Sequence, residues 1–386
     1  MIRLVTGVPL LVCWWCAAEA AQDSEQLDRR LSLVEAQRAQ GRLAAAESML
    51  AGLQAEIGER QPPGYFAIWA LREHGLLRDD EGKPDEAIPF YERALAMLRA
   101  QPAPGPVTIG LLLASLASSH ADCGDSALGL SYSTEAMTVL RTAAGSTSPD
   151  FAVALYAHAV ALRSLHRNTE ALRDLREALD IWHHSTKPDD PQLALVHEAI
   201  GTSQAELGYL NQAEASEREA LAIRTRILEP DSVGIAATLN NLGVILSRAQ
   251  RFSEARQSLE RAVQIFAQSG ESEQQRLAAA LGNLGRIYFN QARMSAPLYA
   301  KAEEAYRRQL AIEEGLFGSS DVRIAATLEM LGEVLYQERA FTEAGRTYGR
   351  GLAIQQAAFG PADPKTQAAA KRYNFLVKKM KPDPER

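Results

Sequence analysis

The sequence predicts an all-α protein built from stacked helical hairpins, and three observations support that prediction. Ala and Gly recur with a period of 42 residues through most of the chain. Each period contains two apolar stripes with helical spacing, separated by a short turn. Alternating β-branched residues, which are typical of strands, are almost absent, while Pro and Gly gather where turns are expected. Together these observations favour a repeat array over a single globular core.

The small residues occupy three positions in each repeat. In the sixth repeat these are Gly243, Ala255 and Ala262. Over eight repeats, with a five-residue insertion in the seventh, 21 of the 24 positions hold Ala or Gly, whereas their share of the chain would place about six there by chance. Small side chains let two antiparallel helices approach closely, so each repeat is predicted to be a helical hairpin. The exceptions are Val34, Leu53 and Gln309.

The pattern is clearest over residues 238–266. A first apolar stripe surrounds Leu242, the chain turns at Gln250, and a second stripe includes Leu259 and Phe266. Neither helix of such a hairpin can bury its stripe alone. The hairpins must therefore stack, and their apolar faces must form one continuous core.

Three runs of sequence resemble a known family. They are ATLNNLGVILSRAQRFSEARQSLERAVQI (237–265), AALGNLGRIYFNQ (279–291) and ATLEMLGEVLYQERAFTEAGRTYGRGLAI (326–354). These runs resemble the tetratricopeptide repeat, and in particular the 42-residue variety of kinesin light chains. The resemblance implies a solenoid of about eight antiparallel hairpins over residues 21–363, forming a superhelix with a concave groove. Residues 364–386 are then expected to form a capping helix and a short polar tail.

Residues 1–20 precede the array and read as a signal peptide. Arg3 gives a positive start, an apolar run follows, and Ala18-Glu19-Ala20 is an A-x-A cleavage signal. We expect cleavage after Ala20 and export to the periplasm of a bacterium or to the medium. A retained anchor is the alternative, but the apolar run is shorter than the ~20 residues that cross a bilayer.

A lipid anchor is a further alternative, because Cys13 and Cys16 lie in the same segment. Bacterial lipoprotein signals place a small residue directly before the acylated cysteine, whereas this chain has Val12 and Trp15 there. The sequence therefore favours a mature protein without a lipid and without stable membrane insertion.

Composition excludes several function classes. The chain of 386 residues carries a net charge of −7 and shows no basic stripe, which disfavours nucleic acid as a partner. It has no phosphate loop, dinucleotide turn, nucleophile elbow or HExxH motif, so we expect neither an enzyme nor a cofactor. His183 and His184 could suggest a metal, but neighbouring helical residues point about 100° apart, so they are read as part of a solvated inter-repeat turn.

The family resemblance implies where a partner would bind. In tetratricopeptide arrays the first helix of each hairpin faces the groove, at positions three before the small residue and one, four and five after it. From the second repeat we take Arg72. The main candidates for a peptide-binding groove are Tyr156, Arg163, Asn240, Arg248, Arg286, Phe289, Asn290 and Tyr336.

These residue types suit a peptide. Asn can hydrogen-bond to both the N–H and the C=O of an extended segment, Arg can form a bidentate pair with a carboxylate, and Phe or Tyr can pack against an apolar side chain. We therefore expect a scaffold that binds a protein partner through a peptide segment or a helix. The alternatives are a non-catalytic subunit or regulator of an enzyme complex, and a self-associating structural protein.

Overall fold

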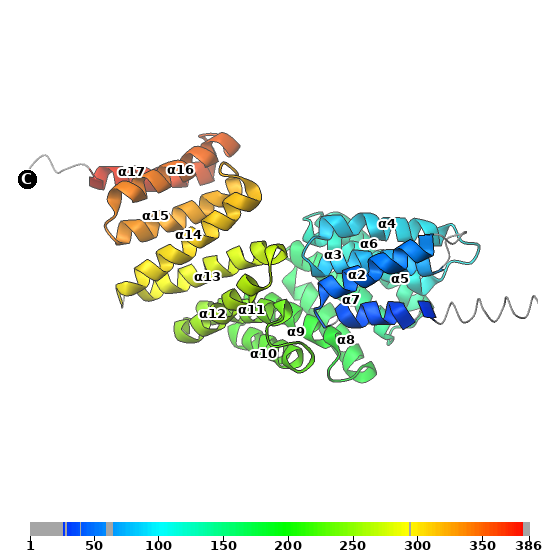
Figure 1. Cartoon of the computed structure of the whole chain (residues 1–386). Coiled ribbons are helices and arrows are strands. Elements are labelled where there is room, and N and C mark those ends of the chain that lie inside the picture. The colour runs from blue at the N-terminus through cyan, green and yellow to red at the C-terminus, as the bar shows by residue number, and fades with distance from the viewer. Residues whose placement is uncertain (1–25, 28, 39, 59–64, 293–294, 381–386) are drawn as a thin grey trace, which may run out of the picture. The chain divides into compact units, whose positions relative to one another are not determined.

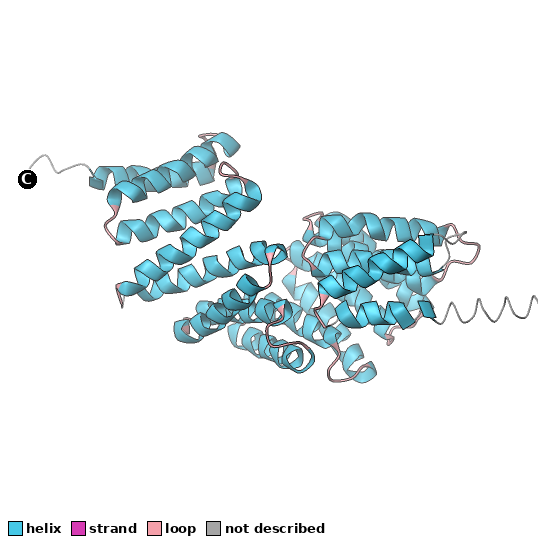
Figure 2. Ribbon diagram, in the orientation of Figure 1, coloured by secondary structure: helices cyan, strands magenta, loops and turns pink. Residues whose placement is uncertain are grey.

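The computed structural model describes residues 26–27, 29–38, 40–58, 65–292 and 295–380. All regular structure in this part of the chain is helical, which confirms the predicted all-α class (Figures 1 and 2). The predicted signal peptide, residues 1–20, lies outside the described residues. The polar tail after residue 380 does so too.

The described chain begins with helical residues, which include 29–38, and further helices follow in order. They are α2 (Leu43–Gly58), α3 (Tyr65–Asp80), α4 (Pro84–Arg99), α5 (Pro106–Asp122), α6 (Ser126–Ala143), α7 (Pro149–Ser164), α8 (Asn168–Ser185), α9 (Pro191–Glu206), α10 (Leu210–Ile227), α11 (Val233–Arg248), α12 (Phe252–Gln268), α13 (Gln274–Ala292), α14 (Pro297–Phe317), α15 (Ala325–Gln337), α16 (Phe341–Phe359) and α17 (Pro364–Met380). Two 3₁₀ turns, η1 (Glu271–Glu273) and η2 (Val322–Ile324), precede α13 and α15.

The helices fall into two compact units, Met1–Leu207 and Gly208–Arg386. In the first unit, α3 packs on α4, α5 on α6 and α7 on α8, and each hairpin also packs on the next. In the second unit, α11 packs on α12, α13 on α14 and α15 on α16, and α17 packs on α16. Each unit is thus a stack of antiparallel hairpins, as the period predicts.

The turns inside the hairpins share one backbone motif. In the sixth hairpin, Gln250 has a φ of 61° and the N–H of Arg251 bonds to the carbonyl of Leu246, which closes α11 as a Schellman motif. The position seven residues after the first small residue is left-handed in six further hairpins. It is occupied by Gly41, Gly82, Gly124, His166, Gly208 and Arg339.

The small residues lie where the two helices of a hairpin meet. A Cβ on Gly243 would lie 2.6 Å from Cγ of Leu259, and one on Gly129 would lie 2.8 Å from the carbonyl oxygen of Ala117. All 24 positions of the grid are buried except Gln309, which is half-buried. The prediction of close helix crossings is therefore confirmed.

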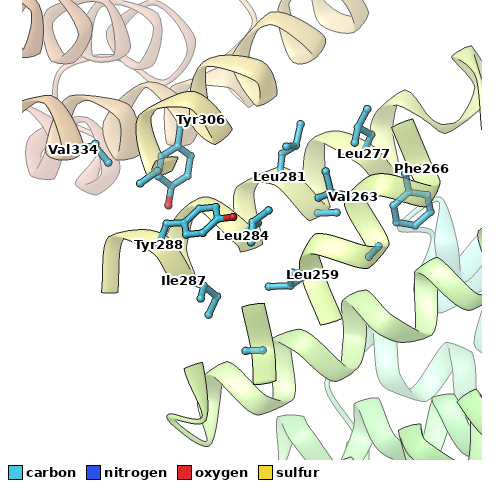
Figure 3. Packing of buried hydrophobic residues seen from close by; sticks show 14 of the residues in the cluster. Leu259, Val263, Phe266, Leu277, Leu281, Leu284, Ile287, Tyr288, Tyr306 and Val334 are labelled. Carbon is cyan, nitrogen blue, oxygen red and sulfur yellow. The ribbon is translucent and has the colours of Figure 1, made fainter. Parts of the chain in front are cut away.

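The core of the second unit runs from hairpin to hairpin. Figure 3 shows Leu259 of α12 beside Ile287 of α13, with Tyr306 of α14 and Val334 of α15 continuing the same cluster. Each of these four side chains is at most 2% exposed. The hairpins share one apolar ribbon because no single hairpin can cover its own stripe.

The insertion in the seventh repeat is partly helical. α13 continues to Ala292, past Asn290, which is the position equivalent to the last residue of α11. α14 begins at Pro297, whose fixed φ and missing N–H suit the first turn of a helix. Pro297 lies five residues before Ala302, whereas Phe252 lies three before Ala255, so the extra sequence lengthens both α13 and α14.

Candidate functional site

The predicted partner-binding surface lies on the first helix of each hairpin. It consists of the residues three positions before, and one, four and five positions after, the small residue of that helix. We call this surface the A-face. Residues one repeat apart on the A-face lie on neighbouring first helices, so a row of side chains can run across several hairpins.

The A-face of α11 and α13 carries a connected polar row. Nδ2 of Asn283 donates a hydrogen bond to Oδ1 of Asn240 at 3.0 Å, and the guanidinium of Arg286 donates to Oδ1 of Asn283 at 3.2 Å. Asn240 and Arg286 were predicted site residues, whereas Asn283 was not. Asn283 lies two residues before Gly285, a position outside the rule that was applied to the sequence.

Arg248 and Asn290 lie on the last turn of α11 and near the end of α13, and both are exposed. Arg286, between them along the chain, is exposed as well. Four of the predicted residues therefore share the A-face of α11 and α13, the first helices of two consecutive hairpins: Asn240, Arg248, Arg286 and Asn290. Together with Asn283 they form what we call the polar row.

Phe289 packs against the second helix of its own hairpin. Its ring centroid is 5.9 Å from that of Tyr299 on α14, in an edge-on arrangement, and the side chain is half-buried. The prediction treats Phe289 as a shelter for a partner side chain. In the structure the ring packs within its own hairpin, so only part of it faces solvent.

The A-face of the eighth hairpin is in contact with α17. The ring of Tyr336 lies 5.6 Å from Phe341 and 6.5 Å from Phe375 of α17, measured between centroids. Beside it, Arg372 of α17 forms an ion pair with Glu329 of α15. Tyr336 is therefore part of an aromatic cluster with the last helix.

The two predicted residues of α7 also have partners inside the first unit. The half-buried ring of Tyr156 lies 6.3 Å from Trp182 of α8. Arg163 lies near Asp122, at the end of α5. Removal from water raises the pKa of the Asp122 carboxyl, and the Arg163 cation opposes that shift.

The first unit also contains an ionic network that the prediction missed. Arg38 lies 2.8 Å from Oδ2 of Asp80 and 3.3 Å from Oε2 of the buried Glu73. Asp80 stands five residues after Gly75, a groove position under the same rule that predicts Arg72. The sequence therefore contains the signal for Asp80, whereas the spacing does not show that Arg38 is its partner.

Asp79, the residue before Asp80, accepts hydrogen bonds from two hydroxyls. Tyr91 of α4 donates to Oδ2 at 2.7 Å, and Ser119 of α5 donates to Oδ1 at 2.9 Å. Burial raises the pKa of Asp79 to about 7, despite the two hydrogen bonds, which lower it. The Asp79 carboxyl therefore changes charge near neutral pH.

No group of three or more metal-ligating side chains gathers among the described residues. His183 and His184 lie in the last turn of α8 rather than in the connection that was predicted, and His184 bonds to the carbonyl of Asp180 at 2.7 Å. In the part of the chain that the structure describes, no helix is long and apolar enough to cross a bilayer.

Comparison with known proteins agrees with this fold. Residues 150–226 and 234–296 match the family model described as tetratricopeptide repeat. No curated protein matches the sequence.

Solved structures of similar fold span most of the chain. The apo form of the quorum sensor NprR from B. thuringiensis is 14% identical, with a TM-score of 0.56 over 88% of this chain and 92% of that one. A Rap protein complexed with competence and sporulation factor is 15% identical, with a TM-score of 0.53 over 92% of this chain and 98% of that one. A putative kinesin light chain from Podosopora anserina is 15% identical, covers 53% of this chain and 97% of that one, and has a TM-score of 0.40, too low to support an argument.

The hairpin stack and its small-residue grid define a helical-repeat protein with polar side chains along its first helices. The family match over α7–α10 and α11–α13 identifies these hairpins as tetratricopeptide repeats, as the sequence predicted.

Proposed function

We propose that this protein is an exported, non-catalytic scaffold that binds a partner protein by laying an extended or helical segment of it on the A-face of α11 and α13. The observation that carries the proposal is the polar row, in which Asn283 joins Asn240 to Arg286 across two hairpins. A peptide backbone needs donors and acceptors along its length, and this row offers both. Export rests on the sequence of residues 1–20.

The charge of the polar row indicates the kind of segment. Arg248 and Arg286 are both exposed on neighbouring first helices of an otherwise acidic chain. Two cations on the binding surface favour a segment that carries negative charge, and the amides orient its backbone.

The test replaces Arg248 and Arg286 together by Ala and measures recovery of the partner from the exported fraction. Truncating a charged contact in an interface costs about 2–4 kcal/mol of binding free energy. The double variant should therefore lose its partner. Its helical content and melting temperature should change little, because neither side chain lies in the hairpin core.

The matched control removes two arginines from second helices, Arg308 of α14 and Arg346 of α16, which are also exposed. Arg256 and Glu260 of α12 form a less suitable pair, because Glu260 accepts a hydrogen bond from Tyr288 at 2.7 Å. Wild-type recovery by the A-face variant would rule out this site. Equal loss in the control would place the binding surface elsewhere.

A further inference from the structure

Three hairpins carry a tyrosine whose ring lies across a glycine of the first helix. In each, the tyrosine stands four residues after the small residue of the second helix. A Cβ on the glycine would lie 2.4–3.0 Å from the nearest ring atom, so only glycine leaves room for the ring. The pairs are Gly75 with Tyr91, Gly285 with Tyr306, and Gly332 with Tyr348.

Two of the three hydroxyls have an acidic acceptor on the first helix. Tyr91 donates to Asp79 at 2.7 Å, and Tyr348 donates to Glu333 at 2.8 Å. In both hairpins the ring therefore passes the glycine and delivers its hydroxyl to a carboxylate of an A-face position. A buried hydroxyl requires such an acceptor, because leaving it unpaired is costly.

The third hydroxyl has no hydrogen-bond partner among the described residues. Tyr306 is 2% exposed, and its Oη is buried. Figure 3 shows the ring extending from α14 with its hydroxyl toward α13. The residue after Gly285 is Arg286, whereas the equivalent residue after Gly332 is Glu333, so a cation stands where an acceptor stands in the other hairpin.

The charges beside the Tyr306 hydroxyl differ from those beside Tyr348. Burial raises the pKa of the Tyr306 hydroxyl, so it is neutral and can donate at neutral pH. Arg286 is near enough to oppose that shift. A neutral donor and a cation lie together, and among the described residues no carboxylate contact serves them as Glu333 serves Tyr348.

A second unpaired group lies one turn away. Gln309, the exception in the small-residue grid, reaches Gly282 of α13, where an added Cβ would lie 2.7 Å from Oε1. Its Nε2 donates to Glu313 at 2.8 Å, which leaves Oε1 as a buried acceptor without a partner among the described residues. Because Gly282 and Gly285 have no side chains, two polar residues of α14, Gln309 and Tyr306, pack directly against α13.

We propose that Tyr306 and Arg286 together bind a carboxylate of the partner segment. The carboxylate accepts one hydrogen bond from Oη of Tyr306 and pairs with the guanidinium of Arg286, which turns from Asn283 toward the ligand. Oε1 of Gln309 then accepts a hydrogen bond from a neighbouring N–H of the segment. This inference rests on the proposed function and specifies the chemistry that the A-face recognises.

A carboxylate can come from an Asp or Glu side chain or from a chain terminus, and the experiment separates these sources. The full chain is screened on two arrays of random peptides, one attached through the C-terminus and one through the N-terminus. Only the second presents free terminal carboxylates. The best binder is then made in solution in two forms, with its carboxylate intact or converted to the amide.

We expect wild-type protein to prefer the carboxylate form by about tenfold or more, since hydrogen bonds to charged groups contribute more than neutral ones. Tyr306→Phe should reduce this preference by about tenfold while leaving affinity for the amide form unchanged. Tyr348→Phe, whose hydroxyl already has Glu333, is the matched control and should keep the preference.

Each other result contradicts the inference. An equal preference in wild type and Tyr306→Phe would show that the hydroxyl does not contact the carboxylate. Peptides that bind wild type equally well as carboxylate and amide would overturn the inference while leaving the proposed function intact. The absence of any binder on both arrays would overturn the proposed function, and this inference with it.

Discussion

Nδ2 of Asn283 on α13 donates a hydrogen bond to Oδ1 of Asn240 on α11. The orientation of the Asn283 amide follows from Arg286, because a guanidinium only donates and it donates to Oδ1 of Asn283. Arg372 of α17 and Glu329 of α15 repeat this relation in the last hairpin. In both cases the residue three positions before the small residue, Asn240 or Glu329, contacts a side chain two helices further along, Asn283 or Arg372. This kind of contact therefore recurs along the array and is not specific to one hairpin.

Replacing Gly243 by Leu should destabilise the sixth hairpin. Even a Cβ at this position would lie 2.6 Å from Leu259 and 3.2 Å from the carbonyl oxygen of Ala255. Overpacking typically costs about 1–3 kcal/mol of unfolding free energy. Amide exchange should rise first in α11, α12 and the adjoining helices, because repeat arrays unfold through neighbour contacts.

The control is Gly315→Ala on α14, where an added Cβ meets no atom within 4 Å. This change should stabilise the protein by about 0.5–1 kcal/mol, since glycine weakens a helix interior. Uniform loss of exchange protection in Gly243→Leu would contradict the proposed hairpin boundaries.

Gln250→Gly should stabilise the turn between α11 and α12. Gln250 has a φ of 61°, a conformation that costs an L-residue about 1–2 kcal/mol and costs glycine little. The greater freedom of glycine in the unfolded chain offsets part of that gain, so we expect a net increase of about 0.5–1 kcal/mol by chemical denaturation. Gly124→Gln at the equivalent turn should have the opposite sign, and equal signs would contradict the argument.

Replacing Tyr91, Tyr306 and Tyr348 by Phe, one at a time, should change the free energy of unfolding differently for Tyr306 than for the other two. Tyr91→Phe and Tyr348→Phe remove hydrogen bonds to carboxylates and should lower the unfolding free energy by about 1–3 kcal/mol. Tyr306→Phe removes a buried hydroxyl that has no partner in the described part of the chain, so it should leave stability unchanged or raise it. A loss of stability in Tyr306→Phe equal to the other two would mean that this hydroxyl is already paired in the unliganded protein.

Stability should decrease with rising pH through Asp79. Its folded pKa of about 7 lies above the value of 3.8 expected without burial, so the folded protein holds a proton that the unfolded chain has released. The Asp79 contribution is complete below about pH 4 and is lost as the pH rises to about 7. Unfolding curves of wild type and Asp79→Asn between pH 5 and 8 test this, since the variant should lack that part of the slope. Parallel pH profiles would show that Asp79 does not hold the proton.

The exported protein should begin at Ala21 and carry no lipid, because the A-x-A signal ends at Ala20. Intact-mass measurement of the mature protein checks both statements. An N-terminus at residue 1 in the membrane fraction, or an acyl group on Cys13 or Cys16, would contradict the proposed location.

By itself the sequence determined the helical hairpins, their period and the residues between their helices. Gly243 and Ala255 could be placed from spacing alone, because the faces of a helix recur at fixed intervals and close crossings admit only small side chains. Asn240 and Arg286 could be assigned to one surface for the same reason.

Only the tertiary structure decided which of those side chains interact. Asp79 with Tyr91, Tyr336 with Phe375 and the unpaired hydroxyl of Tyr306 depend on how neighbouring helices are rotated and on which rotamers the packing permits. The spacing of residues along one helix carries no information about the acceptor on the next. The polar row could therefore be predicted as a surface, whereas its hydrogen bonds, and the nearby Tyr306 hydroxyl that has no partner among the described residues, depend on the tertiary structure.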